Sequence, residues 1–289
     1  MENNKVLITL GCSFTEGVGC YDYTGYSDDA LRKIKEQGGF SDKLYGKNLN
    51  NFLEGSWGSQ LQEILGVSTF YNVGKGGDSN SGQSKSFYDQ IDTLNLKDKD
   101  VLVIFMMTYS HRFSFYNEGI PQTFDFTPNE YGGYRNKLVN EYVKVIIDDF
   151  DYNTVCEHFY YLRNVYELCK ARGFKFAWCN VENRVVDEIY PMLPNDLKKC
   201  LLKHPIYQYD MIESILNSEN PSFLSKICGH PNEHGYKLVA ERIFGAITNI
   251  YPEFLRDKLV ELYNNDTIQY EKIPINREEY KLKKNKVKL

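Results

Sequence analysis

The sequence predicts a three-layer α/β sandwich, in which helices cover both faces of a parallel β-sheet. Short apolar runs typical of buried strands alternate along the chain with longer segments whose apolar residues recur at helical spacing. With 289 residues, 42% of them hydrophobic, the chain is long enough to bury one large core. No internal repeat and no long linker divides that core.

The first part of the chain contains three expected strands and two expected helices. Residues 5–10 (KVLITL) form an apolar run that Gly11 stops, and 100–107 (DVLVIFMM) is the most convincing buried strand. A shorter strand is expected over 69–73. A helix with one apolar face is expected over 57–65, and another helix is expected over 84–94.

The second part continues the alternation. Helices are expected over 138–149 and 154–172, and the run FKFAWCNV predicts a strand over 174–181. Prolines break the next segment, 185–227, into short helical pieces. A last amphipathic helix is expected over 234–249.

We expect one domain over residues 1–250 and a C-terminal extension over 251–289. Two Tyr- and Gly-rich excursions, 21–56 and 109–136, leave the core of that domain. The extension ends in KLKKNKVKL, which is either a solvated tail or a basic arm for an anionic partner.

Composition narrows the possible functions. Lys and Arg number 34 against 39 Asp and Glu, so the net charge of −5 argues against a dedicated nucleic-acid binder. No apolar run approaches the ~18 residues of a membrane helix, and the N-terminal run is too short for a signal peptide. The seven cysteines form no CxxC pair, which argues against a structural zinc site. No metal and no cofactor are expected. A cytoplasmic protein with reduced thiols is expected, and association with a virion remains open.

A serine directly follows the first predicted strand, in Gly11-Cys12-Ser13-Phe14-Thr15-Glu16-Gly17. Ligands of α/β sheets bind at the carboxyl ends of the strands, where Ser13 would lie. Ser13 is therefore a candidate acyl-transfer nucleophile, and the alternative is that it only caps a helix.

A glycine-rich turn, NVGKGGDSN, follows the second predicted strand. Glycines allow backbone N–H groups to approach a ligand, so Gly77 is a candidate donor to an oxyanion. A phosphate cradle would need the Lys-Ser/Thr of a P-loop, which is missing here. The remaining alternative is a tight strand-to-helix turn.

The segment GHPNEHG precedes the last predicted helix and offers a general base, His230. His230 and His234 also have a spacing found in metal sites. No Cys or carboxylate ligand set accompanies them in an obvious pattern, which favours the general base.

Together, and in this order, the three motifs resemble the SGNH/GDSL hydrolase superfamily over roughly residues 5–248. The resemblance implies a flavodoxin-like α/β/α sandwich. It further implies that Ser13 is the nucleophile, that His230 is the base, and that the N–H groups of Ser13 and Gly77 bind the oxyanion. The combination of GCSFT, G-SN, T-x-x-x-R and HPNE is similar to SGNH-like proteins associated with bacteriophage genomes.

Two positions depart from the family pattern. Tyr109 stands where the family has the Asn that is the third oxyanion donor, so Tyr109, Ser110 or Arg112 would have to replace it. Cys228 stands where the family has the Asp that orients the histidine. A thiol cannot stabilise an imidazolium as a carboxylate does, so a Ser–His dyad is the minimal machinery.

We therefore expect an SGNH-type esterase acting on a small-molecule or carbohydrate ester, with O-acetyl groups preferred because Tyr-rich excursions suit sugar stacking. Asn80 and Arg112 are expected to contact substrate, although Arg112 could instead pair with an acid such as Asp78. The alternatives are a catalytically degenerate binding or structural protein, such as a phage component, and an anion-binding or transferase site.

Overall fold

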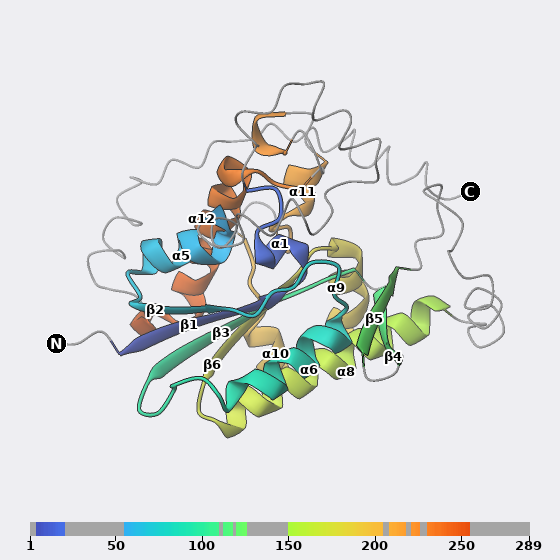
Figure 1. Cartoon of the computed structure of the whole chain (residues 1–289), viewed down its shortest axis with the longest axis horizontal. Helices are drawn as coiled ribbons and strands as arrows, with labels where there is room; N and C mark the ends of the chain where they lie inside the picture. The colour runs from blue at the N-terminus through green and yellow to red at the C-terminus, as the bar shows by residue number, and fades with distance from the viewer. Residues whose placement is uncertain are drawn as a thin grey trace.

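A computed structural model describes residues 4–20, 55–109, 112–117, 120–125, 150–204, 208–217, 221–225 and 230–254. These residues form a parallel sheet with helices on both of its faces (Figure 1). The predicted three-layer α/β architecture is confirmed. The division into a domain and a C-terminal extension remains a prediction, since most of the extension lies outside the described residues.

The sheet has four strands in the order β2-β1-β3-β6. The strands are β1 Lys5–Gly11, β2 Thr69–Asn72, β3 Asp100–Met107 and β6 Lys175–Asn180. Every neighbouring pair is parallel, and β1 lies between β2 and β3. The loops that follow these strands therefore start from one edge of the sheet, and the loop after β1 starts near its centre.

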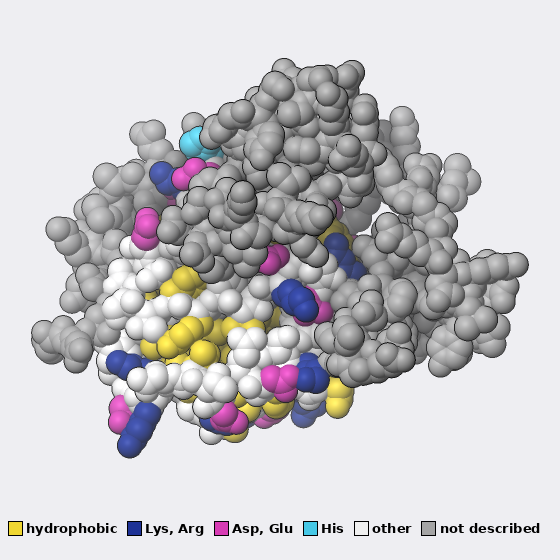
Figure 2. Space-filling view, in the orientation of Figure 1, with side chains coloured by type: hydrophobic (Ala, Val, Ile, Leu, Met, Phe, Trp, Pro, Cys, Tyr) yellow, Lys and Arg dark blue, Asp and Glu magenta, His cyan; other side chains and the backbone are white. Residues whose placement is uncertain are grey.

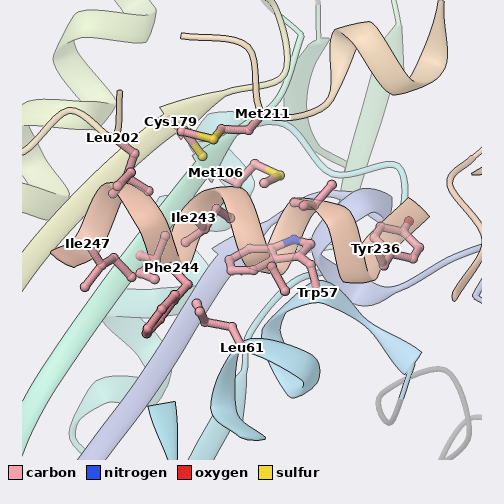
Figure 3. Close-up of a cluster of buried hydrophobic side chains, with 14 of the residues drawn as sticks. Trp57, Leu61, Met106, Cys179, Leu202, Met211, Tyr236, Ile243, Phe244 and Ile247 are labelled. Carbon is pink, nitrogen blue, oxygen red and sulfur yellow. The ribbon is translucent and has the colours of Figure 1, made fainter. Parts of the chain in front are cut away.

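One face of the sheet is covered by α5 (Trp57–Leu65) and α12 (Glu233–Ile250), which lie side by side above it in Figure 1. Trp57 and Leu61 of α5 and Phe244 of α12 belong to the buried cluster on this face, together with Met106 of β3 (Figure 3). The indole N–H of Trp57 has no hydrogen-bond partner among the described residues. Burial of these large side chains attaches the last helix of the core to the sheet.

The other face is covered by α6 (Asn80–Ile91) and α8 (Phe150–Ala171), below the sheet in Figure 1. Alternate residues of β1 divide between the two faces, as the period of a strand requires. Leu7 belongs to the first cluster, whereas Val6 and Ile8 belong to the second.

Shorter elements complete the described part of the chain. They are α1 Ser13–Glu16, β4 Arg112–Asn117, β5 Ile120–Asp125, α9 Asn183–Ile189, η1 Tyr190–Met192, α10 Asn195–Lys199, α11 Glu213–Leu216, η2 Pro221–Phe223 and η3 Pro252–Phe254. The predicted helical pieces of 185–227 correspond to α9, η1, α10, α11 and η2.

Two local expectations differ from the structure. The helix expected over 84–94 begins at Asn80, because the Ser79 side chain caps it by accepting from the N–H of Gly82 at 3.1 Å. The excursion over 109–136, for which no strand is predicted, contains the antiparallel hairpin β4–β5. The helix expected over 138–149 and residues 21–54 of the first excursion lie outside the described residues.

The described surface carries both signs of charge. In Figure 2, Lys and Arg side chains lie beside Asp and Glu along the lower edge of the molecule. Within the described ranges, no helix combines the length and the apolar character needed to cross a bilayer.

Candidate active site

Ser13 is the first residue of α1, the short helix that follows β1 at the carboxyl edge of the sheet. Only 6% of its surface is exposed. The turn into α1 is tight, since a Cβ on Gly11 would lie 1.9 Å from Thr15 Oγ1 and 2.9 Å from the carbonyl oxygen of Met106. Glycine at position 11 therefore allows the chain to turn directly from the strand to the serine.

His230 lies next to Ser13, although 217 residues separate them in the sequence. The Nε2 atom of His230 is 2.8 Å from Ser13 Oγ, which is hydrogen-bonding distance. The imidazole also packs on the ring of Phe14, with ring centroids 4.9 Å apart. A serine hydroxyl bonded to an imidazole nitrogen is the arrangement in which a histidine can take the serine proton.

Backbone contacts fix the segment that carries His230. The carbonyl of His230 accepts from the N–H of Ser225 at 2.7 Å, and Leu224 and Pro231 form an antiparallel bridge. Asn232 then caps α12 by accepting from the N–H of Gly235 at 3.0 Å.

The start of α12 is also tied to the residues that follow α1. The N–H of Glu233 donates to the carbonyl of Cys20 at 3.0 Å, and the hydroxyl of Tyr236 donates to the carbonyl of Val18 at 2.7 Å. These two bonds hold the histidine segment against the serine segment.

The glycine-rich turn after β2 lies beside Ser13. The N–H of Lys75 donates to the carbonyl of Gly11 at 3.0 Å, and a Cβ on Gly76 would lie 3.8 Å from Ser13 Cβ. Gly77 has a φ of +74°, which side chains rarely tolerate, and a Cβ built there would meet nothing within 4 Å. The turn thus places glycine backbone beside the serine and leaves open space at Gly77.

The N–H groups of Ser13 and Gly77 donate no hydrogen bond to any group in the described part of the chain. The neighbouring N–H of Gly76 donates instead to Glu16 Oε2 at 2.6 Å. Burial raises the pKa of Glu16, while the bond from Gly76 and the charge of Lys75 act against this rise. Two backbone donors near the serine are therefore available to a ligand.

Tyr109 follows β3 and reaches the same edge of the sheet. Its ring makes an edge contact with Phe14 at 6.2 Å, and the guanidinium of Arg112 lies 5.1 Å from the centre of the Tyr109 ring. Burial, and next the proximity of Cys12, raises the pKa of the Tyr109 phenol to about 12. The phenol is therefore protonated, and able to donate, through the whole neutral range.

The two residues expected to bind substrate, Asn80 and Arg112, are both hydrogen-bonded to Thr108. The side chain of Asn80 is bonded to Thr108 and His158, and only 3% of Asn80 is exposed. Arg112 is partly exposed, and its Nη1 donates to Thr108 Oγ1 at 3.2 Å. Their contact with substrate remains a prediction.

Other expected features have mixed outcomes. Cys12 is completely buried, which suits a packed thiol, and His234 is exposed on the surface of α12. Cys228, at the position of the family Asp, and Ser110, a possible replacement for the family Asn, lie outside the described residues. Within the described ranges, no group of three His, Cys, Asp or Glu side chains could hold a metal ion.

Sequence reasoning missed the residues that hold the site together. Asn232 and Tyr236 lie within and just after the histidine motif, where capping preference was the available signal for Asn232. Two further contacts join segments that are far apart in the sequence, Tyr236 with Val18 and His158 with Asn80. No local sequence pattern predicts such contacts.

The chain matches no protein-family model, and no curated protein matches it by sequence. Solved structures do resemble it. A lipolytic protein of the G-D-S-L family from Desulfitobacterium hafniense DCB-2 is 16% identical, with 84% of this chain and 99% of that chain covered and a TM-score of 0.44. TesA is 11% identical, with 85% and 99% covered and a TM-score of 0.47.

A third structure describes a carbohydrate esterase whose active site displays divergent catalytic and non-catalytic binding functions. It is 14% identical, with 88% of this chain and 72% of that chain covered and a TM-score of 0.46. At such identities, and with TM-scores below 0.5, these likenesses give this chain neither a residue role nor a substrate.

Proposed function

We propose that this chain is a serine ester hydrolase of the SGNH type that works through a Ser13–His230 dyad. The observation that carries the proposal is the 2.8 Å contact between Ser13 Oγ and His230 Nε2. The three sequence motifs support it, since they resemble the nucleophile, glycine and histidine blocks of that superfamily.

The reaction would proceed through an acyl-enzyme. Ser13 Oγ attacks the ester carbonyl carbon while its proton moves to His230 Nε2. Collapse of the tetrahedral intermediate breaks the bond to the alcohol oxygen, which takes that proton from His230. Water then attacks the acyl group and gives a proton to His230, and release of the acid returns that proton to Ser13.

The oxyanion of the tetrahedral intermediate would be bound by the backbone N–H groups of Ser13 and Gly77 and by the hydroxyl of Tyr109. The two N–H groups have no partner in the described part of the chain, which supports this role. The raised pKa of Tyr109 keeps its hydroxyl a donor. Donors aimed at the developing charge supply a large part of such catalysis.

The preferred substrate class is a carbohydrate that carries O-acetyl groups. The support is compositional, because the excursions over 21–56 and 109–136 are rich in tyrosine, and aromatic rings suit stacking on sugars. The hairpin β4–β5 within the second excursion begins at Arg112, close behind Tyr109 at the carboxyl edge of the sheet.

Labelling with a small fluorophosphonate, diisopropyl fluorophosphate, tests the proposal. A small probe is chosen because only 6% of Ser13 is exposed. Ser13 Oγ would form a bond to phosphorus as fluoride leaves, and intact-mass spectrometry would detect the adduct. We expect one adduct on the wild type and none on Ser13→Ala or His230→Ala.

The second candidate is a catalytically inactive binding protein on the same fold, and the low exposure of Ser13 favours it. Absence of an adduct on folded wild type at high probe concentration would contradict the hydrolase and support this candidate. An adduct that persists in Ser13→Ala would place the reactive group elsewhere.

A further inference from the structure

A buried polar group lies beneath the candidate active site, between the sheet and its second helical layer. Its members are Asn80, the first residue of α6, Thr108, which directly follows β3, and His158 in α8. Asn80 and His158 are each 3% exposed, and Thr108 is fully buried. Buried polar groups are expensive unless they are bonded, so the bonds within this group determine how its parts are placed.

The side-chain amide of Asn80 binds both backbone groups of Thr108. The N–H of Thr108 donates to Asn80 Oδ1 at 2.8 Å, which fixes the orientation of the amide because only its oxygen can accept. The opposite atom, Asn80 Nδ2, then donates to the carbonyl of Thr108 at 3.3 Å. Asn80 thus pairs with Thr108 much as a neighbouring strand would.

His158 adds a further bond to this junction. Its Nε2 is 2.9 Å from the carbonyl oxygen of Thr108 and 2.8 Å from Asn80 Nδ2. A protonated Nε2 donates to the carbonyl, whereas an unprotonated Nε2 accepts from the amide. Either tautomer therefore bonds α8 to the junction, through Thr108 in one case and through Asn80 in the other. Arg112 occupies the remaining polar atom, Thr108 Oγ1, at 3.2 Å.

The junction joins the two loops on which the proposed oxyanion site depends. Asn80 is three residues after Gly77, and Thr108 immediately precedes Tyr109. Building on the proposed function, we infer that Asn80, supported by His158, is a positioning residue. It sets the spacing between the Gly77 N–H and the Tyr109 hydroxyl around Ser13. This role replaces the substrate contact that the sequence predicted for Asn80.

A split between kcat and KM tests this inference, with p-nitrophenyl acetate as the substrate. Misplaced oxyanion donors weaken only the transition state, so Asn80→Ala should lower kcat about tenfold to hundredfold and leave KM unchanged. Asn80→Asp keeps the acceptor for the Thr108 N–H but loses the donor, so its kcat should lie between those of Asn80→Ala and the wild type.

Gln83→Leu is the matched control. Gln83 is also buried in α6, and neither polar atom of its amide has a partner in the described part of the chain. Replacing it changes the same helix interface without breaking a bond to Thr108, so kcat should stay within about twofold of the wild type. Circular dichroism and thermal melting establish that each variant is folded.

The possible results separate this inference from the function on which it rests. A folded Asn80→Ala variant with unchanged kcat overturns the inference, and so does a raised KM at unchanged kcat, which would make Asn80 a substrate contact. If Asn80→Ala fails to fold, His158→Leu decides by the same kcat and KM criteria. A wild type that neither hydrolyses the ester nor reacts with the fluorophosphonate overturns the proposed function itself, and the inference with it.

Discussion

At the scale of single residues, the proposed mechanism assigns to the hydroxyl of Tyr109 the role of an oxyanion donor, at the position where the family that the sequence resembles has an asparagine. Tyr109→Phe keeps the ring that contacts Phe14 at 6.2 Å and removes only the hydroxyl. Loss of one such donor costs roughly 3–4 kcal/mol of transition-state stabilisation, so kcat for p-nitrophenyl acetate should fall about a hundred- to thousandfold. Stopped-flow or steady-state hydrolysis measures the fall.

Tyr109→Leu is the comparison for Tyr109→Phe, because it removes the aromatic ring as well as the hydroxyl. The difference in kcat between the two variants gives the contribution of ring packing, separate from that of the hydroxyl. Equal kcat in wild type and Tyr109→Phe would remove Tyr109 from the oxyanion site. Ser110 and Arg112, the other residues considered for the missing donor, would then be tested in its place.

Ser13 and His230 of the candidate site could be chosen from the sequence, but the contacts that support them could not. Ser13 and His230 carry recognisable motifs, and their contact at 2.8 Å follows from where those motifs stand relative to strand and helix ends. The bond from Gly76 to Glu16 and the bonds of His158 join segments far apart in the chain. A glutamate or histidine in a helix has no local mark that distinguishes such a role from simple exposure or packing.

At the scale of elements, the cap of α12 connects helix stability to the placement of His230. Asn232 Oδ1 caps the helix, while Asn232 Nδ2 donates to the carbonyls of Ser222 at 2.9 Å and Leu224 at 3.3 Å. Asn232→Asp preserves the cap and loses both donors, whereas Asn232→Ala loses all three bonds. Only Asn232→Ala should lose the ~1 kcal/mol of stability that a cap contributes.

Both Asn232 variants should label more slowly with fluorophosphonate, because both loosen the segment that presents His230. Thermal melting and labelling rates, measured on the same preparations, separate the two effects. A wild-type labelling rate in folded Asn232→Asp would show that the cap alone places the histidine.

Elements with a strong pattern of apolar residues could be predicted from the sequence. Elements whose bounds depend on side-chain contacts were harder to predict. The strand over 100–107 was predicted because its residues are almost all apolar, and β3 occupies Asp100–Met107. The start of α6 was missed because DSNSG has the composition of a loop, although Ser79 acts there as a cap. The strand β4 was missed within a Tyr-rich excursion, although the alternation in RFSFYN is a strand pattern.

At the scale of the whole molecule, the parallel strand order β2-β1-β3-β6 brings the residues of the candidate site together, because the loops that follow these strands all start from one edge of the sheet. This consequence of the fold class could be anticipated from the alternation of strands and helices alone. The packing around α12 could not be anticipated in this way. It includes an arginine, Arg242, that is fully buried and donates to the carbonyl of Met211 at 3.2 Å and to Ser214 Oγ at 2.9 Å.

The buried His204, which lies near the charge of Arg242, makes the stability of the whole fold depend on pH. Burial, and then the charge of Arg242, lowers the pKa of His204 from 6.5 to about 4. Between these values the unfolded chain binds more protons than the folded chain, so stability rises with pH. Conversely, the protein should lose stability as the pH falls from 6.5 toward 4.

His204→Gln removes this titration while keeping a polar side chain, so its melting temperature should fall less than that of the wild type between pH 7 and pH 4.5. Asp210 also interacts with Arg242, and burial raises its pKa, which gives an opposite dependence that both proteins share. The difference between the two melting profiles therefore isolates His204. Parallel profiles across this range would mean that His204 does not limit stability in acid, and that other titrating groups cause any loss.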